Sequence, residues 1–355
     1  MTSPRKTDVR VEALVSGRLV PSSRFRVLQH VDALRRLGVE VSARPPRVSK
    51  YASVPGRWAR RPVVAPTARV VLQAAKLGSR LPAAARSWGA DVTWLEREVL
   101  PGHLTLEPVL RRPVVFDVDD AIWLLSDGHE RATRAIARRA ACVVAGNDFL
   151  ADWFTAEAPA VERVWTAIDT QRFVPGARVD QPFVVGWTGS GQSLRYLRAM
   201  APAIGRFFVE APDARLVVMA EAFVDLPGIP LDRVDLVLWS PATEAKVIQE
   251  FDVGLMPLGG GTWAKGKCAF KLLQYLACAV PAVVSPVGMN AQVLAMADVG
   301  LAATTEDEWV EALLTLYRDR DRARALGRRG RQLTEQAFSV PVIAPQLAAV
   351  MRRYR

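Results

Sequence analysis

The sequence has few of the residues that usually form disulfides or bind metals. Three cysteines and three histidines occur in 355 residues. The cysteines are too few and too scattered for a disulfide framework or a zinc site, and the histidines show no metal-ligand spacing. We therefore expect a protein of the reducing cytoplasm without a metal site formed by these residues.

Long hydrophobic runs are also missing. No apolar run reaches the roughly 18 residues needed to span a bilayer, and Asp8, Arg10 and Glu12 interrupt the first apolar stretch, so we expect no signal peptide. Half of the residues are nevertheless hydrophobic and 23% are charged, a composition typical of a globular protein rather than a disordered one. The length favours two domains.

Acidic residues are absent between Glu40 and Asp91, and this window carries nearly all of the net charge of +11. Its cations are Arg44, Arg47, Lys50, Arg57, Arg60, Arg61, Arg69, Lys76, Arg80 and Arg86. Such a basic patch indicates an anionic partner. We interpret residues 41–90 as a surface for an anionic membrane. Nucleic acid is an alternative that no recognition motif supports, and a solvated basic surface is another.

The same window divides into two parts. Its first part is loop-like and places Tyr51 and Trp58 among the cations. Its second part predicts a helix over residues 67–81 with an aliphatic face and a cationic flank, and Pro82 is expected to end or bend it. The aliphatic face holds Val70, Ala74, Leu77 and Leu81, and the flank holds Arg69, Lys76 and Arg80.

Short β-rich runs alternate with helical patterns along the chain, which predicts an α/β fold with parallel sheets. Strands are expected at VRVEALVS, GVEVSAR, DVTWLE, PVVFDV, CVVAG and VERVW, then at PFVVGWTGS, ARLVVMAE, RVDLVLW, FDVGLMPL, VPAVVS and VGLAAT. A helix with a serine cap should cover residues 22–38. We expect an amino-terminal domain over residues 1–170, a linker over 171–181, a second domain over 182–340, and a helix over 341–355 that packs back on the first domain.

A lysine-bearing helix before the strand VPAVVS indicates a phosphate site. At about 100° per residue, Lys267, Lys271, Gln274 and Cys278 share one stripe and leave an apolar stripe for the sheet. The preceding loop GGGTWAKGK and the helix start suggest N–H groups for a diphosphate. Gly288 and Asn290 open the next helix at the same edge of the sheet. A solvated amphipathic helix is the competing interpretation.

Three further groups of residues are candidates. Asp117, Asp119 and Asp120 end a strand; we favour Asp119 or Asp120 for acceptor orientation over metal binding or helix capping. Ser22, Arg24 and Arg26 follow the first strand and suit an anionic substrate. Gly186, Gly189 and Gly191 with Glu221 allow a dinucleotide-binding oxidoreductase, although their spacing differs from G-x-G-x-x-G.

The segment FDVGLMPL…KGKCAFKLLQYLACAVPAVVSPVGMNAQVL resembles the sugar-nucleotide site of family-4-type glycosyltransferases. FDVDDAIW, VVAGNDFLADWF, VWTAIDTQRFVP and VVGWTGSGQSLRYL are similar to other family segments in the expected order. The resemblance implies a GT-B fold, namely two tandem doubly wound Rossmann-like domains with a cleft between them. It also implies a retaining transfer from a nucleoside-diphosphate sugar that needs neither a metal nor another cofactor. The basic patch adds the expectation of a saccharide or lipid-linked acceptor at the inner face of the cytoplasmic membrane.

The sequence departs from the family in its paired glutamates, where Gly266 and Gln274 stand instead; this is similar to a lysine-containing branch of the family. The candidate catalytic residues are Lys267, Lys271, Asp119 and Asp120, and the candidate donor-binding residues are Gly189, Ser190, Trp239, Lys265, Gly266, Gln274, Gly288 and Asn290. Ser22, Arg24 and Arg26 are the candidate acceptor or phosphate contacts. A non-catalytic module that binds nucleotide sugar or membrane is a further alternative. The sugar, the base and the oligomeric state stay open.

Overall fold

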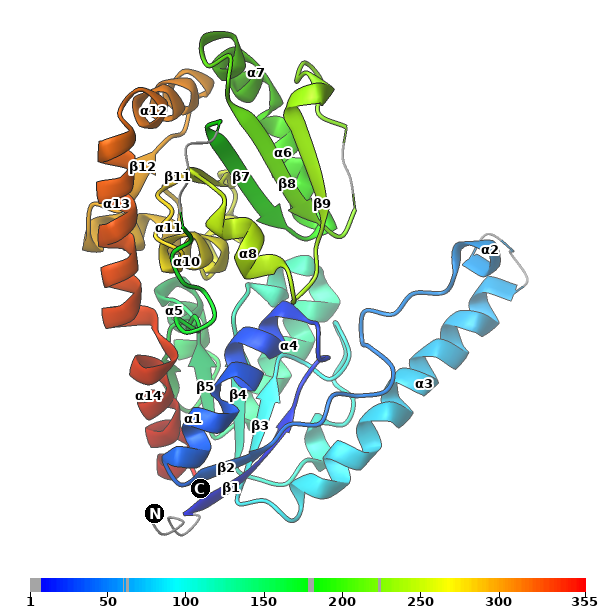
Figure 1. Ribbon diagram of the computed structural model, residues 1–355. Helices are drawn as coiled ribbons and strands as arrows, with labels where there is room; N and C mark the ends of the chain where they lie inside the picture. The colour runs from blue at the N-terminus through cyan, green and yellow to red at the C-terminus, as the bar shows by residue number, and fades with distance from the viewer. Residues whose placement is uncertain (1–7, 60, 62–63, 178–181, 223–224) are drawn as a thin grey trace. The chain divides into compact units, whose positions relative to one another are not determined.

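The computed structural model describes residues 8–59, 61, 64–177, 182–222 and 225–355. The chain divides into two compact units, the first formed by Met1–Ala167 with Ile343–Arg355 and the second by Ile168–Val342. Each unit contains one six-stranded parallel sheet with helices packed on it (Figure 1). The expected linker lies in the second unit, and its residues 178–181 are outside the described residues.

The sheet of unit 1 has the order β2-β1-β3-β4-β5-β6, and all six strands expected from the sequence are present. The chain passes from β1 to β2 on one side of the sheet and then crosses back to β3 on the other side of β1. The strand order therefore reverses at β1, and the carboxyl ends of β1 and β3 form a switch point. The strands are β1 (Val9–Leu14), β2 (Val39–Ser42), β3 (Val92–Glu96), β4 (Val114–Val118), β5 (Cys142–Ala145) and β6 (Val161–Arg163).

The helices of unit 1 differ from the prediction at the start of the chain. The expected continuous helix over residues 22–38 is divided into η1 (Ser23–Val27), η2 (Leu28–His30) and α1 (Val31–Arg36). The expected serine cap is wrong, since no side chain caps η1. The Ser23 hydroxyl instead donates to Glu96 Oε2 at 2.7 Å. Gly38 ends the segment with a φ of +81°, the left-handed conformation that glycine tolerates best.

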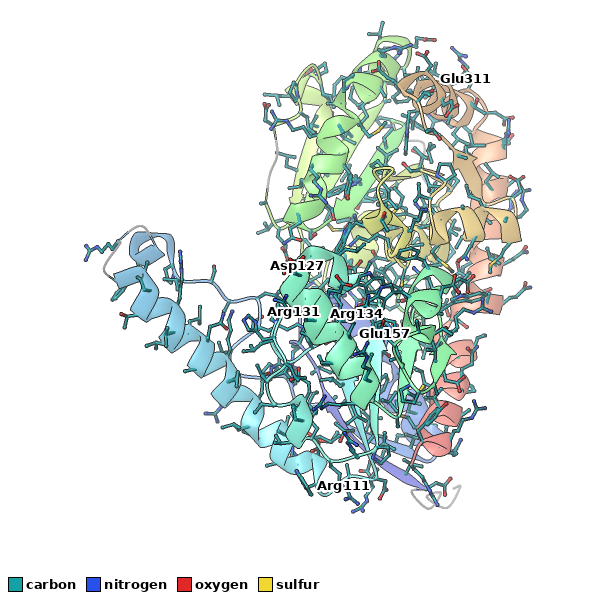
Figure 2. The ribbon with its side chains drawn as sticks, turned by 180° about the vertical axis from the view of Figure 1, so that it is seen from behind. Arg111, Asp127, Arg131, Arg134, Glu157 and Glu311 are labelled. Atoms are coloured by element: carbon teal, nitrogen blue, oxygen red, sulfur yellow. The ribbon has the colours of Figure 1, made fainter. Side chains whose placement is uncertain are left out.

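The other helices of unit 1 surround the sheet, except that α3 runs outward from it and has α2 at its far end (Figure 1). In Figure 2, Arg134 of α4 lies beside Glu157, which follows α5, and the two side chains form an ion pair. The elements are α2 (Gly56–Ala59), α3 (Val64–Ser87), η3 (Glu107–Val109), η4 (Ile122–Leu125), α4 (Asp127–Arg139), α5 (Asp148–Thr155) and α14 (Val340–Arg353).

The carboxyl-terminal helix α14 packs on the first unit. Arg353 forms an ion pair with Glu162 of β6, and the Tyr354 hydroxyl donates to the same carboxylate at 3.2 Å. Arg352 donates to the carbonyl oxygen of Leu37. The chain therefore returns to the unit in which it began.

The sheet of unit 2 has the order β12-β11-β10-β7-β8-β9, with all six expected strands present. Here the order reverses between β7 and β10, which places a second switch point at their carboxyl ends. The strands are β7 (Val184–Gly189), β8 (Arg215–Ala220), β9 (Val234–Leu238), β10 (Val253–Met256), β11 (Ala282–Val284) and β12 (Gly300–Ala302).

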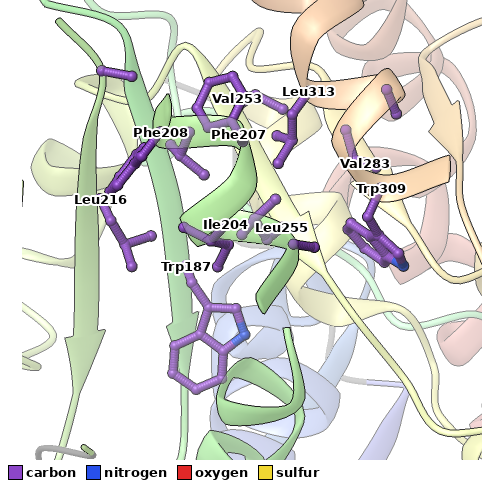
Figure 3. Packing of buried hydrophobic residues seen from close by; sticks show 14 of the residues in the cluster. Trp187, Ile204, Phe207, Phe208, Leu216, Val253, Leu255, Val283, Trp309 and Leu313 are labelled. Carbon is purple, nitrogen blue, oxygen red and sulfur yellow. The ribbon is translucent and has the colours of Figure 1, made fainter. Parts of the chain in front are cut away.

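The core of unit 2 fills the space between this sheet and its helices. Figure 3 shows Phe207 of α7 and Leu313 of α12 among residues of β7 and β10, and Trp187 is buried at the lower edge of the cluster. The helices are η5 (Gly191–Ser193), α6 (Leu194–Ala199), α7 (Ala201–Glu210), η6 (Leu231–Arg233), α8 (Glu244–Gln249), α9 (Thr262–Lys265), α10 (Phe270–Ala277), α11 (Met289–Met296), α12 (Glu306–Arg318), α13 (Arg320–Leu333) and η7 (Thr334–Phe338).

Candidate functional site

Lys271 lies beside the last residue of β7, at the switch point of unit 2. A Cβ atom added to Gly189 would lie 2.9 Å from Lys271 Cε and 2.5 Å from the ring of Trp187. The Lys271 ammonium lies 4.9 Å from the centroid of that ring, which is a cation–π distance. The first of the predicted donor contacts, Gly189, is thus close to one of the two predicted catalytic lysines.

Lys267 occupies a different place from the one that the helical pattern predicts. Helix α10 begins at Phe270, after Ala269 takes a left-handed conformation with a φ of 51°. Lys267 therefore precedes the helix, and its ammonium lies 4.8 Å over the ring of Trp263. The expectation that both lysines share a stripe of one helix is wrong, because the chain turns sharply at Ala269.

The loop GGGTWAKGK contains the short helix α9 and closes on itself. The N–H of Gly266 donates to Trp263 O at 3.2 Å, and the N–H of Lys267 donates to Ala264 O at 3.2 Å. These two N–H groups hold the turn, whereas the sequence suggested that they point to a diphosphate. The side chain of Lys265, which ends α9, is exposed.

Gly288 brings the start of α11 against this loop. Its φ of +56° favours glycine, and a Cβ atom there would lie 2.8 Å from the carbonyl oxygen of Lys265. Asn290 is buried and donates to Ser285 O at 3.1 Å, while its Oδ1 has no hydrogen-bond partner among the described residues. The structure thus brings together Lys265, Gly288 and Asn290.

Gln274 is buried, whereas its position on the helical wheel predicts that it lies on the exposed stripe with the lysines. Only 2% of the residue is exposed, because its amide donates to Glu244 Oε1 at 2.9 Å. Trp239 donates to the same oxygen at 3.1 Å, and Arg172 pairs with Glu244 Oε2 at 3.0 Å. Glu244 was missed by the sequence reasoning, since nothing in ATEAKV signals a contact with a residue thirty positions away.

The glycine turn at the end of β7, over residues 186–191, is only partly available to a ligand. A Cβ atom at Gly186 would lie 2.0 Å from the ring of Phe251, so this glycine serves core packing. Ser190 is exposed, and its hydroxyl lies 3.3 Å from Ser193 Oγ. The glycines of the alternative dinucleotide motif therefore have at least two unrelated roles.

In unit 1 the three aspartates form ion pairs with two different arginines. Asp117 is buried and accepts from Arg26 at 2.7 Å and from Trp94 at 3.2 Å. Burial outweighs these contacts and raises the pKa of Asp117 to about 6. Asp119 and Asp120 both bind Arg97, at 2.6 and 3.2 Å.

Arg97 holds the two aspartates from an unusual backbone position. Its φ is 54°, a left-handed conformation that is uncommon for arginine. Burial alone would lower the pKa of Arg97, but attraction by Asp119, Tyr51 and Asp120 raises it well above its ordinary value. Asp119 and Asp120 consequently share one permanent cation, which balances one of their two negative charges.

The predicted acceptor contacts are largely buried. Arg26 also donates to Val164 O at 2.8 Å and stabilises the unit rather than an exposed ligand. Arg24 lies 4.6 Å over the Phe25 ring. Ser22 is buried, and its hydroxyl has no hydrogen-bond partner among the described residues. The Ser22 hydroxyl thus has hydrogen-bonding capacity that its described surroundings do not use.

The basic segment contains α2 and α3. The exposure of side chains on α3 is the reverse of the one that its helical pattern predicts. Val70 is 69% exposed and Leu81 is 54% exposed, whereas Lys76 and Arg80 are buried. The helix also continues through Pro82 to Ser87. Arg60 and the side chain of Arg57 are outside the described residues.

The described residues form neither a metal-binding cluster nor a membrane-spanning helix. Among the residues that the structure describes, no group of three or more histidine, cysteine, aspartate or glutamate side chains is placed to hold a metal ion. In the same part of the chain, no helix is both long and apolar enough to cross a bilayer.

The two doubly wound units define a GT-B fold, and comparison with solved structures agrees. Sucrose-phosphate synthase from Thermosynechococcus elongatus superposes with a TM-score of 0.69 at 14% identity, covering 97% of this chain and 98% of its own. HepE of Anabaena, in complex with UDP and glucose, gives 0.70 at 14% identity, covering 97% and 100%.

A third similar structure is WaaG, a glycosyltransferase involved in lipopolysaccharide biosynthesis. Its TM-score is 0.63 at 12% identity, and the match covers 97% of this chain and 99% of WaaG. No protein-family model matches the sequence, and no curated protein matches it. The similarity therefore concerns the fold along nearly the whole chain.

Proposed function

We propose that this protein is a glycosyltransferase that takes a sugar from a nucleoside diphosphate, in the manner of the family-4-type enzymes that its sequence resembles. The observation that carries the proposal is the contact of Lys271 with Gly189 at the switch point of unit 2, the position at which doubly wound sheets bind nucleotides. HepE, which has the same fold, is seen with UDP-glucose, and this supports UDP as the first nucleotide to test.

In this proposal the donor diphosphate binds beside Lys271 and Lys267. Both ammonium groups lie over tryptophan rings, so they are positioned before a ligand arrives. Lysine ammonium groups near the leaving diphosphate stabilise the negative charge that develops on it. Glu244 and Gln274 present a carboxylate and an amide in one cluster, and we assign them to recognition of the nucleoside. The resemblance places a family glutamate at the position of Gln274.

The proposed transfer retains the anomeric configuration. The bond between the anomeric carbon and the donor phosphate oxygen breaks, and a bond from that carbon to the acceptor oxygen forms on the same face of the sugar. The acceptor hydroxyl proton passes to the leaving phosphate. This route is the one that the resemblance implies, and it needs no side-chain base. Asp119 and Asp120, held by Arg97, are proposed to orient the acceptor.

We further propose that the acceptor is a saccharide or lipid-linked saccharide reached at the inner membrane surface. Val70, Val71 and Leu81 of α3 are exposed beside cations of the same segment. A helix that exposes aliphatic and basic side chains together suits the interface of an anionic bilayer. Nucleic acid has no supporting motif.

The test is thermal stabilisation by a panel of nucleoside diphosphates and their sugars, followed by transfer and donor-hydrolysis assays. UDP should raise the melting temperature of the wild type, because a ligand stabilises the state that binds it. Lys271→Ala should weaken UDP binding about tenfold, the effect of one charge-assisted hydrogen bond. Lys246→Ala is the control, since Lys246 is exposed and two positions from Glu244, on another side of α8.

Two results would contradict the proposal. Stabilisation by NAD or NADP and by no nucleoside diphosphate would favour the oxidoreductase alternative. UDP binding without transfer or hydrolysis of any donor would favour a non-catalytic binding module.

A further inference from the structure

A pocket of about 610 Å³ lies in unit 1 between residues 44–48 and α3, and it reaches the carboxyl end of β1. Four arginines line it: Arg44 and Arg47 from one side and Arg80 and Arg86 from α3. The pocket thus adjoins the carboxyl end of β1, one of the two strands whose ends form the switch point of the unit 1 sheet, and doubly wound folds place ligands near such points. All of its lining residues belong to unit 1.

The positive charge of this pocket is only partly neutralised by the protein. Arg86 pairs with Glu12 at 2.8 Å. Arg44 and Arg47 are exposed, and no acidic side chain among the described residues bonds to either. Three of the four guanidinium groups, including that of Arg80, thus lack a bonded carboxylate in the described part of the chain.

Arg80 is the most unusual of the four. It is only 4% exposed, yet its described partners are neutral: it donates to the carbonyl oxygens of Val15 and, at 3.4 Å, Ser16. Its Nε is buried without a hydrogen-bond partner among the described residues. Burial lowers the pKa of Arg80 even though Glu96 attracts it. A buried cation of this kind costs free energy that a bound anion would offset.

The two walls of the pocket are held together by a hydrogen bond and by rigid residues. The Ser79 hydroxyl of α3 lies 3.3 Å from the carbonyl oxygen of Val48, which ties the helix to the opposite wall. Pro45 and Pro46 stiffen that wall, and Leu14 and Val15 close the end of the pocket at β1. Guanidinium groups therefore line an open pocket from two opposite walls.

We propose that this arginine pocket binds a phosphate group and that it holds the phosphate of the acceptor substrate. The second part rests on the proposed glycosyltransferase function. A phosphate ester has several oxygens and up to two negative charges, so it can accept hydrogen bonds from guanidinium groups on both sides at once. A single carboxylate would engage fewer of them. The apolar walls would accommodate the group to which the phosphate is attached.

The first experiment is calorimetric titration of the full-length protein with inorganic pyrophosphate in the presence of saturating UDP, which occupies the proposed donor site. Wild-type protein should bind, and Arg44→Gln and Arg47→Gln should each raise the Kd about tenfold. Both residues are exposed, so the variants should fold normally. Arg69→Gln removes the same charge from an exposed position of α3 outside the pocket and should change the Kd by less than about twofold.

The absence of pyrophosphate binding by the wild type would overturn the proposal. An equal loss in Arg69→Gln and Arg44→Gln would also overturn it, because that result indicates diffuse surface charge. UDP binding and donor hydrolysis are measured separately. Failure of the donor site with intact, Arg44-dependent pyrophosphate binding would therefore refute the proposed function and leave the phosphate pocket standing.

Sedimentation with vesicles distinguishes the two sources of phosphate. Phosphatidylcholine vesicles with and without phosphatidic acid are compared for wild type, Arg44→Gln and Arg69→Gln. Binding that requires phosphatidic acid and is lost only in Arg44→Gln supports a lipid phosphate. Pyrophosphate binding that depends on Arg44, without selective vesicle binding, supports a soluble phosphorylated acceptor.

Discussion

The packing of Gly189 against Trp187 and Lys271 predicts a specific effect of one added methyl group. In Gly189→Ala the new Cβ would lie 2.5 Å from the Trp187 ring and 2.9 Å from Lys271 Cε. Trp187 is buried and has little room to move. Lys271 is a flexible side chain, so the methyl group should displace its ammonium from the end of β7.

Two magnitudes follow from this geometry. Overpacking a buried ring typically costs 1–3 kcal/mol, so the free energy of unfolding should fall by about 1–3 kcal/mol. Displacement of Lys271 should also weaken UDP binding about tenfold, as removal of its ammonium group does. Gly191→Ala is the matched control, because a Cβ atom there has no heavy atom within 4 Å.

Urea unfolding followed by tryptophan fluorescence measures the first effect, and calorimetric titration with UDP measures the second. Gly189→Ala and Gly191→Ala are compared under the same conditions. If both variants unfold and bind UDP like the wild type, the contact between the end of β7 and Lys271 does not exist in solution. A loss of stability with unchanged UDP affinity would separate packing from binding and remove Lys271 from the donor site.

Two further predictions concern buried titratable groups. Glu244→Gln removes the charge paired with Arg172 and should weaken UDP binding about tenfold. Glu250→Gln, at an exposed position, should leave UDP binding unchanged. Equal UDP affinities of the two variants would exclude Glu244 from nucleotide recognition. Burial lowers the pKa of His30 from 6.5 to about 3, so the free energy of unfolding should fall by up to about 1.4 kcal/mol per pH unit as the pH drops below 6.5 and protonates the unfolded chain. His30→Gln should flatten that slope in urea titrations across the acidic range, and His103→Gln, which is exposed, should leave it unchanged.

The strands were predictable because their information is local. Each is a short run rich in valine and other β-formers between breakers, and a parallel strand that is buried on both faces reads as such a run wherever it lies. The end of the first helical segment at Gly38 was predictable for the same reason, since a left-handed residue after a helix favours glycine. The alternation of strands and helices then indicated the fold class.

The polar contacts of the site were not predictable from local pattern. Ser23 looked like a helix cap, but its hydroxyl bonds to Glu96, 73 residues away in sequence. Gln274 looked exposed on the helical wheel, but it is buried because Glu244 lies beside it in the fold. Periodicity reports which face of a helix is apolar; it carries no information on which distant polar group meets the other face.

Helix α3 shows the same limit of local pattern, here for aliphatic and cationic side chains. Its aliphatic residues were expected to define one face and its cations a flank, yet Val70 and Leu81 are exposed while Lys76 and Arg80 are buried. The cause is again tertiary, because Arg80 finds the carbonyl oxygens of Val15 and Ser16 at the end of β1. An exposed helix is usually read from its apolar stripe, and that reading fails where a buried cation has a specific partner.

Both units use a buried carboxylate to fix polar groups at one edge of the sheet. In unit 1, Glu96 ends β3 and accepts from the hydroxyls of Ser16 and Ser23, at 2.5 and 2.7 Å. In unit 2, Glu244 accepts from Trp239 and Gln274. Hydrogen bonds offset the cost of burying a carboxylate. Glu244 uses both oxygens in this way, whereas Glu96 uses Oε2 and its buried Oε1 has no hydrogen-bond partner among the described residues. Each cluster therefore holds its loops in one arrangement before any ligand binds. Preorganisation of this kind reduces the entropy lost when a substrate binds, and it is the physical reason why substitution of Glu244 should change affinity even if Glu244 never touches the nucleotide.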